Sequence, residues 1–284
     1  MAADGNGPTP RRRPEHVFDV HTHAFPDRLA ATAIPRLEQG ARWFPAKAFH
    51  DGTLAGLAAS MDAAGIDRAI VCSVATRPEQ VPNITAWSQA TASERFVPLA
   101  SIHPDFAEPE AEVDRLAAAG VVGLKFHPQF MGCPADDPRA VRIARAAAEA
   151  GLVMTCHSGY DLSYEKDDVG HPARLARLHE AVPDLRLLAC HMGGWYQWQE
   201  ALDHLAGRPI YLETSMTLGR CPPALLERLF ARHDDAYLLF GTDAPWADQA
   251  QSLEAFRALS LPADLKRRIL WDNALRFIGE PAGG

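Results

Sequence analysis

Short runs of apolar residues recur along the chain, and segments of mixed polarity separate them. From the second run to the eighth, the starts lie 24 to 33 residues apart. This spacing suits a strand followed by a helix that returns to the start of the next strand. The runs are almost continuously apolar, as expected for parallel strands covered on both faces. They are HVFDV (16–20), RAIVCSV (68–74), FVPLASI (96–102), VVGLKF (121–126), LVMTC (152–156), LRLLAC (185–190), PIYLET (209–214) and YLLFG (237–241).

The segments between these runs have helical patterns. Residues 53–64 place apolar side chains on one face and end before Gly65. Segments 110–119 and 138–150 have the same form, and each is followed by glycine and a predicted strand. Eight such units predict an α/β protein built as one (β/α)8 TIM barrel. A doubly wound open sheet is the alternative, although no G-x-G-x-x-G motif follows the first strand to indicate a dinucleotide site.

The interval between the first two runs is longer than the others, at 52 residues. The additional residues, 24–51, begin at the C-terminal rim of the barrel, where active sites lie. We therefore expect it to form a loop over the active site; a packed excursion without substrate contact is the alternative. Residues 1–14 are rich in Gly, Pro and Arg and are expected to form a disordered tail. Residues 15–284 are then a single barrel domain.

Composition and charge narrow the class of partner. Of the 284 residues, 47% are hydrophobic and 23% are charged, which is typical of a globular protein. The net charge of −8 argues against nucleic acid or an anionic membrane as a partner, because phosphates require a basic surface. Five cysteines do not indicate a disulfide framework, and no apolar run suits a signal peptide or a membrane span. We expect a cytoplasmic protein that could form a homodimer through Trp195, Tyr196 and Trp198.

Ionisable side chains gather at the C-terminal ends of the predicted strands. His21 and His23 end the first strand, with both side chains on the same side. Because these strand ends meet at one face of a barrel, the groups should converge. Imidazoles and a carboxylate suit Zn²⁺ and similar ions, which lower the pKa of a bound water to about 7. The other strand ends carry His103, Lys125, His127, His157, His191 and Asp243, of which His191 and Asp243 could accept the proton of that water.

This set of motifs resembles the amidohydrolase superfamily. It is most similar to the amidohydrolase-2 branch, which includes aminocarboxymuconate-semialdehyde decarboxylase and many metal-dependent hydrolases. The resemblance extends from Val17 to about Ile278 and implies one divalent ion, with zinc expected and manganese as the alternative. The metal ligands of the branch correspond to His21, His23, His157 and Asp243, and its catalytic histidine corresponds to His191. The motifs are HTH (21–23), GLKFHP (123–128), TCHSG (155–159), CHMGG (190–194), FGTDAPW (240–246) and WDNALRFIG (271–279).

Lys125 could have any of three roles. In other amidohydrolases a lysine on the fourth strand is carboxylated and bridges two metals, so a second metal is expected only if Lys125 is carboxylated. Its ammonium could instead bind a substrate carboxylate, or it could form a structural ion pair. His103 and His127 are candidates for contact with the substrate or with the ligands. Candidates to line the pocket are Tyr160, Trp195 and Trp246, with ordinary packing as the alternative for each.

The predicted site favours a reaction on a small molecule. We expect a metal-dependent hydrolase that acts on a carboxylate-bearing ester, lactone or amide, with Asp243 accepting the proton of the attacking water and His191 helping to hold the oxyanion. The alternative is a non-oxidative decarboxylase of an aromatic or muconate-type acid on the same site. The preference for hydrolysis comes from the short chain and from GLKFHP, by analogy. A barrel that binds a ligand without turnover is disfavoured, because all the expected ligands and bases are present.

Overall fold

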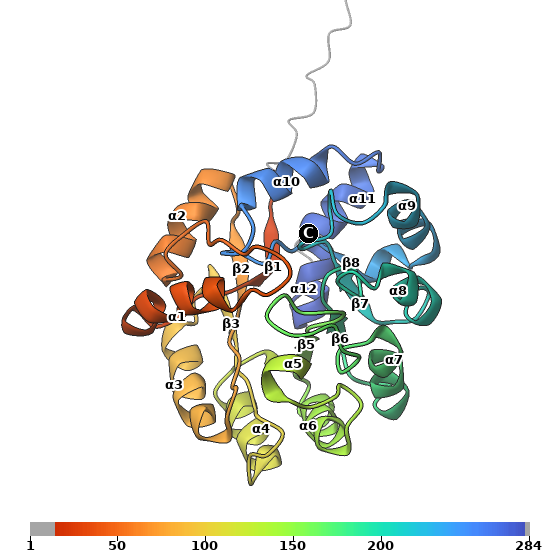
Figure 1. The fold of residues 1–284 in the computed structure, drawn as a ribbon. Helices are drawn as coiled ribbons and strands as arrows, with labels where there is room; N and C mark the ends of the chain where they lie inside the picture. Colours follow the sequence, from red (N-terminus) through yellow and green to blue (C-terminus); the bar gives the residue numbers. More distant parts are fainter. Residues whose placement is uncertain (1–14, 282–284) are drawn as a thin grey trace, which may run out of the picture.

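Eight parallel strands form the centre of residues 15–281, the part of the chain that the computed structural model describes, and helices surround them (Figure 1). Each predicted run overlaps one strand. The first strand extends beyond its predicted end and includes His21 and Thr22. The strands are β1 (Phe18–Thr22), β2 (Arg68–Cys72), β3 (Phe96–Leu99), β4 (Gly123–Phe126), β5 (Val153–Cys156), β6 (Leu187–Ala189), β7 (Tyr211–Glu213) and β8 (Leu238–Leu239).

The strands follow one another in chain order around the barrel. Strands β1 to β3 form one parallel sheet, and β4 to β8 form another. A bridge between Ala100 and Leu124 links β3 to β4, and a bridge between Thr22 and Ala244 links β1 to the segment after β8. This order confirms the predicted TIM barrel and not the doubly wound alternative. As a consequence, the C-terminal ends of all eight strands lie at one face.

Local sequence signals determine where several helices begin and end. The Thr53 hydroxyl accepts a hydrogen bond from the backbone N–H of Gly56 and caps α2 (Leu54–Ala64), which ends at Gly65 with φ of 71°. Asp137 caps α6 (Pro138–Glu149) in the same way. The other α-helices are α1 (Asp27–Gly40), α3 (Val81–Thr91), α4 (Pro109–Ala118), α5 (Pro128–Met131), α7 (Pro172–Ala181), α8 (Trp198–His204), α9 (Pro223–Arg232), α10 (Gln249–Arg257), α11 (Ala263–Arg267) and α12 (Asn273–Ile278). Two short 3₁₀ helices, η1 (Pro78–Gln80) and η2 (Asp235–Tyr237), and one π-helical turn, η3 (Arg268–Asp272), complete the described elements.

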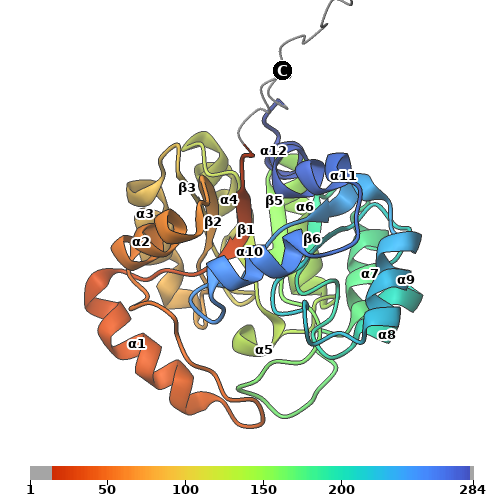
Figure 2. The ribbon, with the colours of Figure 1, turned by 90° about the horizontal axis from the view of Figure 1, so that it is seen from above.

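Apolar side chains fill the barrel at the end away from the predicted site. One buried cluster combines Val20, Ile70 and Leu188 of the strands with Ala274 and Phe277 of α12. A larger cluster lies between the strands and the surrounding helices. Figure 2 shows α12 at one end of the barrel and α1 and α5 at the other. The polar strand ends therefore lie at the end that α12 does not cover.

The segment 24–51 is not only a loop, because residues 27–40 fold into α1. In Figure 2, α1 extends past the barrel at the same end as α5. The predicted tail, residues 1–14, lies outside the described residues. Within residues 15–281, no helix combines the length and apolarity needed to cross a membrane. All five cysteines are buried and unpaired.

Candidate active site

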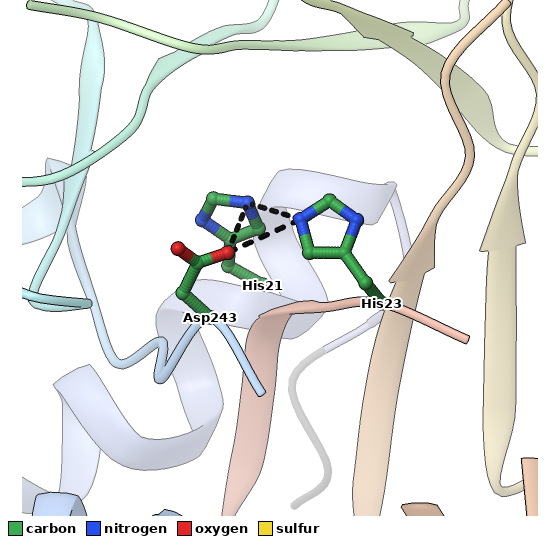
Figure 3. A group of neighbouring side chains, drawn as sticks. All are labelled: His21, His23 and Asp243. Carbon is green, nitrogen blue, oxygen red and sulfur yellow. Dashed lines mark hydrogen bonds and ion pairs between the residues drawn. The ribbon is translucent and has the colours of Figure 1, made fainter. Parts of the chain in front are cut away.

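His21, His23 and Asp243 lie together at the C-terminal face of the barrel. His21 lies in β1, His23 directly follows it, and Asp243 follows β8. The three side chains point toward one another (Figure 3). Oδ1 of Asp243 lies 3.4 Å from Nε2 of His21 and 3.1 Å from Nε2 of His23, and the two Nε2 atoms are 3.2 Å apart. The backbone N–H of Asp243 donates to the carbonyl of His21, which ties the two strand ends together.

The outer nitrogens of both imidazoles face hydrogen-bond acceptors. Nδ1 of His21 is 3.1 Å from Oε1 of Glu213, and Nδ1 of His23 is 3.0 Å from the carbonyl oxygen of Cys72. Because a carboxylate and a carbonyl accept, both Nδ1 atoms carry the imidazole hydrogen. Both Nε2 atoms then direct lone pairs toward Asp243. Three acceptor atoms that converge in this way suit a divalent cation, so these residues could hold the predicted metal.

Burial and neighbouring charges set the protonation of this group. Burial, followed by the charge of Lys125, lowers the pKa of His21 well below its usual range. Burial raises the pKa of Asp243, but the nearby imidazoles of His21 and His23 outweigh it and hold that pKa below its usual range. A neutral imidazole and an ionised carboxylate are the states that bind a metal.

A second polar group lies beside the first and contains His127, His157 and Asp161. The rings of His127 and His157 stack with their centres 4.1 Å apart, and Nε2 of His127 lies 3.5 Å from Oδ2 of Asp161. His191 connects the two groups, because its Nε2 is 3.1 Å from Nδ1 of His157 and its ring lies 5.2 Å from that of His21. His157 is thus placed with His127 and His191 and not among the three converging atoms. Its role as a fourth ligand stays a prediction.

Lys125 is buried between the two groups. Its Nζ lies 2.9 Å from Nε2 of His21 and 3.3 Å from Sγ of Cys190. Both contacts are to nitrogen and sulfur and not to a carboxylate, so a direct ion pair does not hold the side chain in place. The ammonium instead faces the converging ligand atoms.

A cavity of about 160 Å³ opens above these residues. Its volume is below the roughly 300 Å³ at which pockets for drug-sized ligands begin, so it suits a small molecule. Among the described residues that line it, Lys125 is the only lysine or arginine. The polar lining consists of His21, His23, Thr76, Lys125, His127, His157, Asp161, His191 and Asp243. The apolar lining includes Phe25 and Leu37 from the segment 24–51, together with Val74, Phe130, Leu162, Trp195 and Met216.

Three residues that the sequence singles out lie outside this cavity. Nδ1 of His103 accepts a hydrogen bond from the backbone two residues later and so stabilises a turn after β3. Trp246 lines a separate depression. Tyr160 packs edge-on against Trp43, and its carbonyl oxygen, not its ring, contacts His157.

The aromatic residues expected to anchor a second copy are mostly used within the chain. Trp195 and Trp198 are only 3% and 4% exposed, and the indole N–H of Trp198 donates to the carbonyl of His191. Tyr196 is 40% exposed. Two of the three proposed anchors for a homodimer are therefore unavailable to a partner.

The comparison with known families decides the identity of this barrel. A model of the amidohydrolase-2 family, described as Amidohydrolase, matches residues 18–279, which is nearly all of the described chain. The chain belongs to the amidohydrolase family. No curated protein sequence matches it. The family assignment agrees with the resemblance found in the motifs at the strand ends.

Solved structures share the fold of this amidohydrolase. An uncharacterised TIM-barrel protein from Bordetella bronchiseptica is 21% identical, with a TM-score of 0.74 over 93% of this chain and 98% of that chain. The 5-carboxyvanillate decarboxylase from Novosphingobium aromaticivorans, complexed with manganese and 4-hydroxy-3-methoxy-5-nitrobenzoic acid, is 14% identical, with a TM-score of 0.68 over 93% and 96%. A probable 2-pyrone-4,6-dicarboxylic acid hydrolase from Acinetobacter baumannii is 16% identical, with a TM-score of 0.64 over 93% and 99%. Other decarboxylases of aromatic acids are also similar.

One acidic residue of the amidohydrolase site was not among the sequence candidates. Glu213 ends β7 and is fully buried against His21. The signal was present in PIYLET (209–214), where one carboxylate ends an apolar strand just as histidines end others.

Proposed function

We propose that this amidohydrolase is a metal-dependent, non-oxidative decarboxylase of a small aromatic monocarboxylic acid. The observation that carries the proposal is the composition of the cavity. Its lining combines three converging ligand atoms and one ammonium with aromatic and aliphatic side chains. The shared fold with decarboxylases of 5-carboxyvanillate and 2,6-dihydroxybenzoate supports the decarboxylation of an aromatic acid.

The charges in the cavity favour a substrate with a single carboxylate. Besides a metal, Lys125 is the only cation among the described lining residues. Burial lowers the pKa values of His21, His127 and His157 well below their usual range, so these imidazoles add no positive charge at neutral pH. A dicarboxylic acid would bury its second carboxylate without a cationic partner, which costs free energy.

The proposed metal ligands and Lys125 have distinct roles under this proposal. His21, His23 and Asp243 would hold the ion, zinc or manganese, with His157 as the predicted fourth ligand. A bound divalent ion supplies Lewis-acid polarisation of the substrate carboxylate and a neighbouring oxygen. The ammonium of Lys125 binds the same carboxylate and orients it.

Loss of CO₂ leaves a carbon that must take up a proton, and the groups at the cavity wall that can deliver it are His191 and Asp161. Phe25 and Leu37 form apolar parts of the cavity wall and would help to exclude water.

The second candidate is the hydrolase that the sequence favours, acting on a small carboxylate-bearing ester, lactone or amide. Its support is the shared fold with the probable 2-pyrone-4,6-dicarboxylic acid hydrolase. In that reaction Asp243 would accept the proton of the attacking water, and His191 would help to hold the oxyanion.

An isotope experiment separates the two reactions. The purified chain, loaded with Mn²⁺ or Zn²⁺, is incubated with hydroxybenzoic acids and with carboxylate-bearing lactones, once in D₂O and once in H₂¹⁸O. A decarboxylase releases CO₂ and places one deuterium on the carbon that lost it, without ¹⁸O in the organic product. Ring opening with ¹⁸O in the product and no CO₂ would instead establish the hydrolase. The variant His23→Ala, which removes one ligand, should abolish either reaction, and Glu112→Gln, which alters a buried carboxylate elsewhere, should not.

A further inference from the structure

Glu213 is a fully buried carboxylate beneath the cavity, and the proposed chemistry does not use it. It does not line the cavity, so a substrate does not reach it. Oε1 accepts hydrogen bonds from the backbone N–H of His191 at 2.8 Å and from the Ser215 hydroxyl at 2.7 Å, and it faces Nδ1 of His21 at 3.1 Å. Oε2 accepts from the backbone N–H of Ser215 at 2.5 Å. Every one of these partners is a donor to the carboxylate.

The first consequence concerns the metal group. Because Oε1 accepts from Nδ1 of His21, the imidazole carries its hydrogen on Nδ1. Nε2 is then left with the lone pair that faces His23 and Asp243. If the hydrogen moved to Nε2, this nitrogen could no longer bind a cation.

The second consequence concerns His191. This residue has a φ of 61°, a left-handed backbone conformation that a histidine adopts only when neighbouring contacts hold it. Its N–H donates to Oε1 of Glu213, and the N–H of Met192 donates to the backbone carbonyl of Glu213 at 2.6 Å. The Ser215 hydroxyl donates to Glu213, so its oxygen accepts from Nδ1 of His191 at 2.8 Å. Nδ1 of His191 therefore carries a hydrogen in this arrangement.

The surrounding backbone leaves space for this carboxylate. A methyl group at Gly241 would lie 2.5 Å from Oε2 of Glu213 and 3.1 Å from Cβ of His21. A contact of 2.5 Å is shorter than real Cβ atoms show, so glycine at position 241 leaves the space that the Glu213 carboxylate occupies against the segment after β8.

We propose that Glu213 is a positioning residue that fixes the tautomer of His21 and the backbone turn of His191, and so holds a metal ligand and a proposed proton-transfer group in place. This inference rests on the metal site proposed above. Removing such an outer partner of a ligating histidine typically weakens metal binding about 10- to 100-fold.

Glu213→Gln is the sharpest substitution because it keeps the shape of the side chain. If the amide NH₂ takes the position of Oε1, it faces the backbone N–H of His191, which is also a donor. The same NH₂ faces Nδ1 of His21 and would shift the imidazole hydrogen from Nδ1 to Nε2. With the NH₂ at the Oε2 position, it faces the N–H of Ser215 at 2.5 Å. Either orientation places two donors against each other, which costs free energy. Glu213→Asp keeps the carboxylate on a shorter side chain and should recover part of the affinity.

The test measures Mn²⁺ and Zn²⁺ affinity by competition with a chelator, and the His21 tautomer by ¹⁵N NMR of metal-free chain labelled at histidine. We expect about 10- to 100-fold weaker binding for Glu213→Gln. In the wild-type chain, the ¹⁵N shifts should show His21 protonated on Nδ1, with its resonances assigned through His21→Asn. The matched control is Glu112→Gln, another fully buried carboxylate, which accepts from Thr85 and should leave metal affinity unchanged.

Two results would overturn the inference. One is a folded Glu213→Gln chain that binds both ions as tightly as wild type. The other is a wild-type spectrum with His21 protonated on Nε2, which decides the question even if the variant does not fold. If the wild-type chain binds neither ion, the proposed metal site fails, while the tautomer measurement still reports on the positioning by Glu213.

Discussion

Trp43 joins the segment 24–51 to the loop after β5, and its removal should release this cover from the cavity. The indole N–H of Trp43 donates to the backbone carbonyls of Asp161 and Tyr164, both at 3.0 Å. Its ring lies 5.1 Å from that of Trp195, which lines the cavity, and the ammonium of Lys166 lies 5.0 Å above it. These contacts connect α1 to two other loops at the C-terminal face. The perturbation is Trp43→Ala, with Trp43→Phe beside it.

The expected size of the effect follows from these contacts. The hydrogen bond from the Trp43 indole N–H, which the two carbonyls share, contributes about 1 kcal/mol. The aromatic contact between Trp43 and Trp195 contributes about 1 kcal/mol. Loss of the half-buried ring adds roughly 1 to 2 kcal/mol of apolar burial, so Trp43→Ala should cost about 3 kcal/mol in all. Since about 1.4 kcal/mol is a factor of ten, local opening of the segment should increase about 100-fold. Trp43→Phe keeps most of the ring and loses the N–H, so about fivefold is expected.

Hydrogen–deuterium exchange followed by mass spectrometry measures this opening. Peptides from residues 27–40 and 158–168 should exchange faster in Trp43→Ala, while peptides from α6 should keep their wild-type rate. Trp271→Ala is the matched control, because Trp271 packs against Phe18 at the start of β1 and not at the C-terminal face. Unchanged exchange of residues 27–40 in Trp43→Ala would refute the reasoning and would mean that other contacts hold α1 in place.

Three further predictions concern the metal group and the fold. His23→Ala should weaken Mn²⁺ and Zn²⁺ binding at least about tenfold, as measured by chelator competition; full retention of affinity would exclude His23 as a ligand. Burial lowers the pKa values of His21, His127 and His157 below 6.5, so the unfolded metal-free chain binds more protons than the folded one at acidic pH. The free energy of unfolding of the metal-free chain, measured with urea, should therefore fall as pH drops below about 6.5. For three histidines the slope approaches about 4 kcal/mol per pH unit. A free energy of unfolding that stays constant from pH 7 to 5 would contradict this prediction. Glu112→Gln should lower the free energy of unfolding by about 1 to 3 kcal/mol, because buried Thr85 and exposed Arg115 both lose a charged acceptor. Equal urea midpoints for the variant and the wild type would contradict this.

The strand order was predictable because it depends on local patterns. Parallel strands covered on both faces must be apolar over their whole length, and the helix between two strands sets a nearly constant spacing. The position of His21 and His23 followed from the same rule, because a strand end is recognisable wherever the apolar run stops. The helical part of the segment 24–51 was not predictable in this way. Its α1 contains Pro35 and has only two buried residues, so its apolar pattern is weak.

Which strand-end residues lie together in each of the two polar groups depends on the distances between strands. Nothing local distinguishes His157 from His23, yet the fold places His23 beside Asp243 and His157 beside His127. His103 also ends a strand, but its side chain turns back to its own backbone and leaves the cavity.

Glu213 shows the same division between sequence and structure most clearly. The sequence by itself determined that an acidic residue ends an apolar strand of a barrel, because side-chain polarity and strand length are local properties. Only the tertiary structure decided that this carboxylate lies under His21 and His191, because β1, β6 and β7 meet through strand pairing and close packing that no local pattern encodes. The sequence thus determined which chemical groups reach the C-terminal face, and the packing of the barrel decided which of them touch.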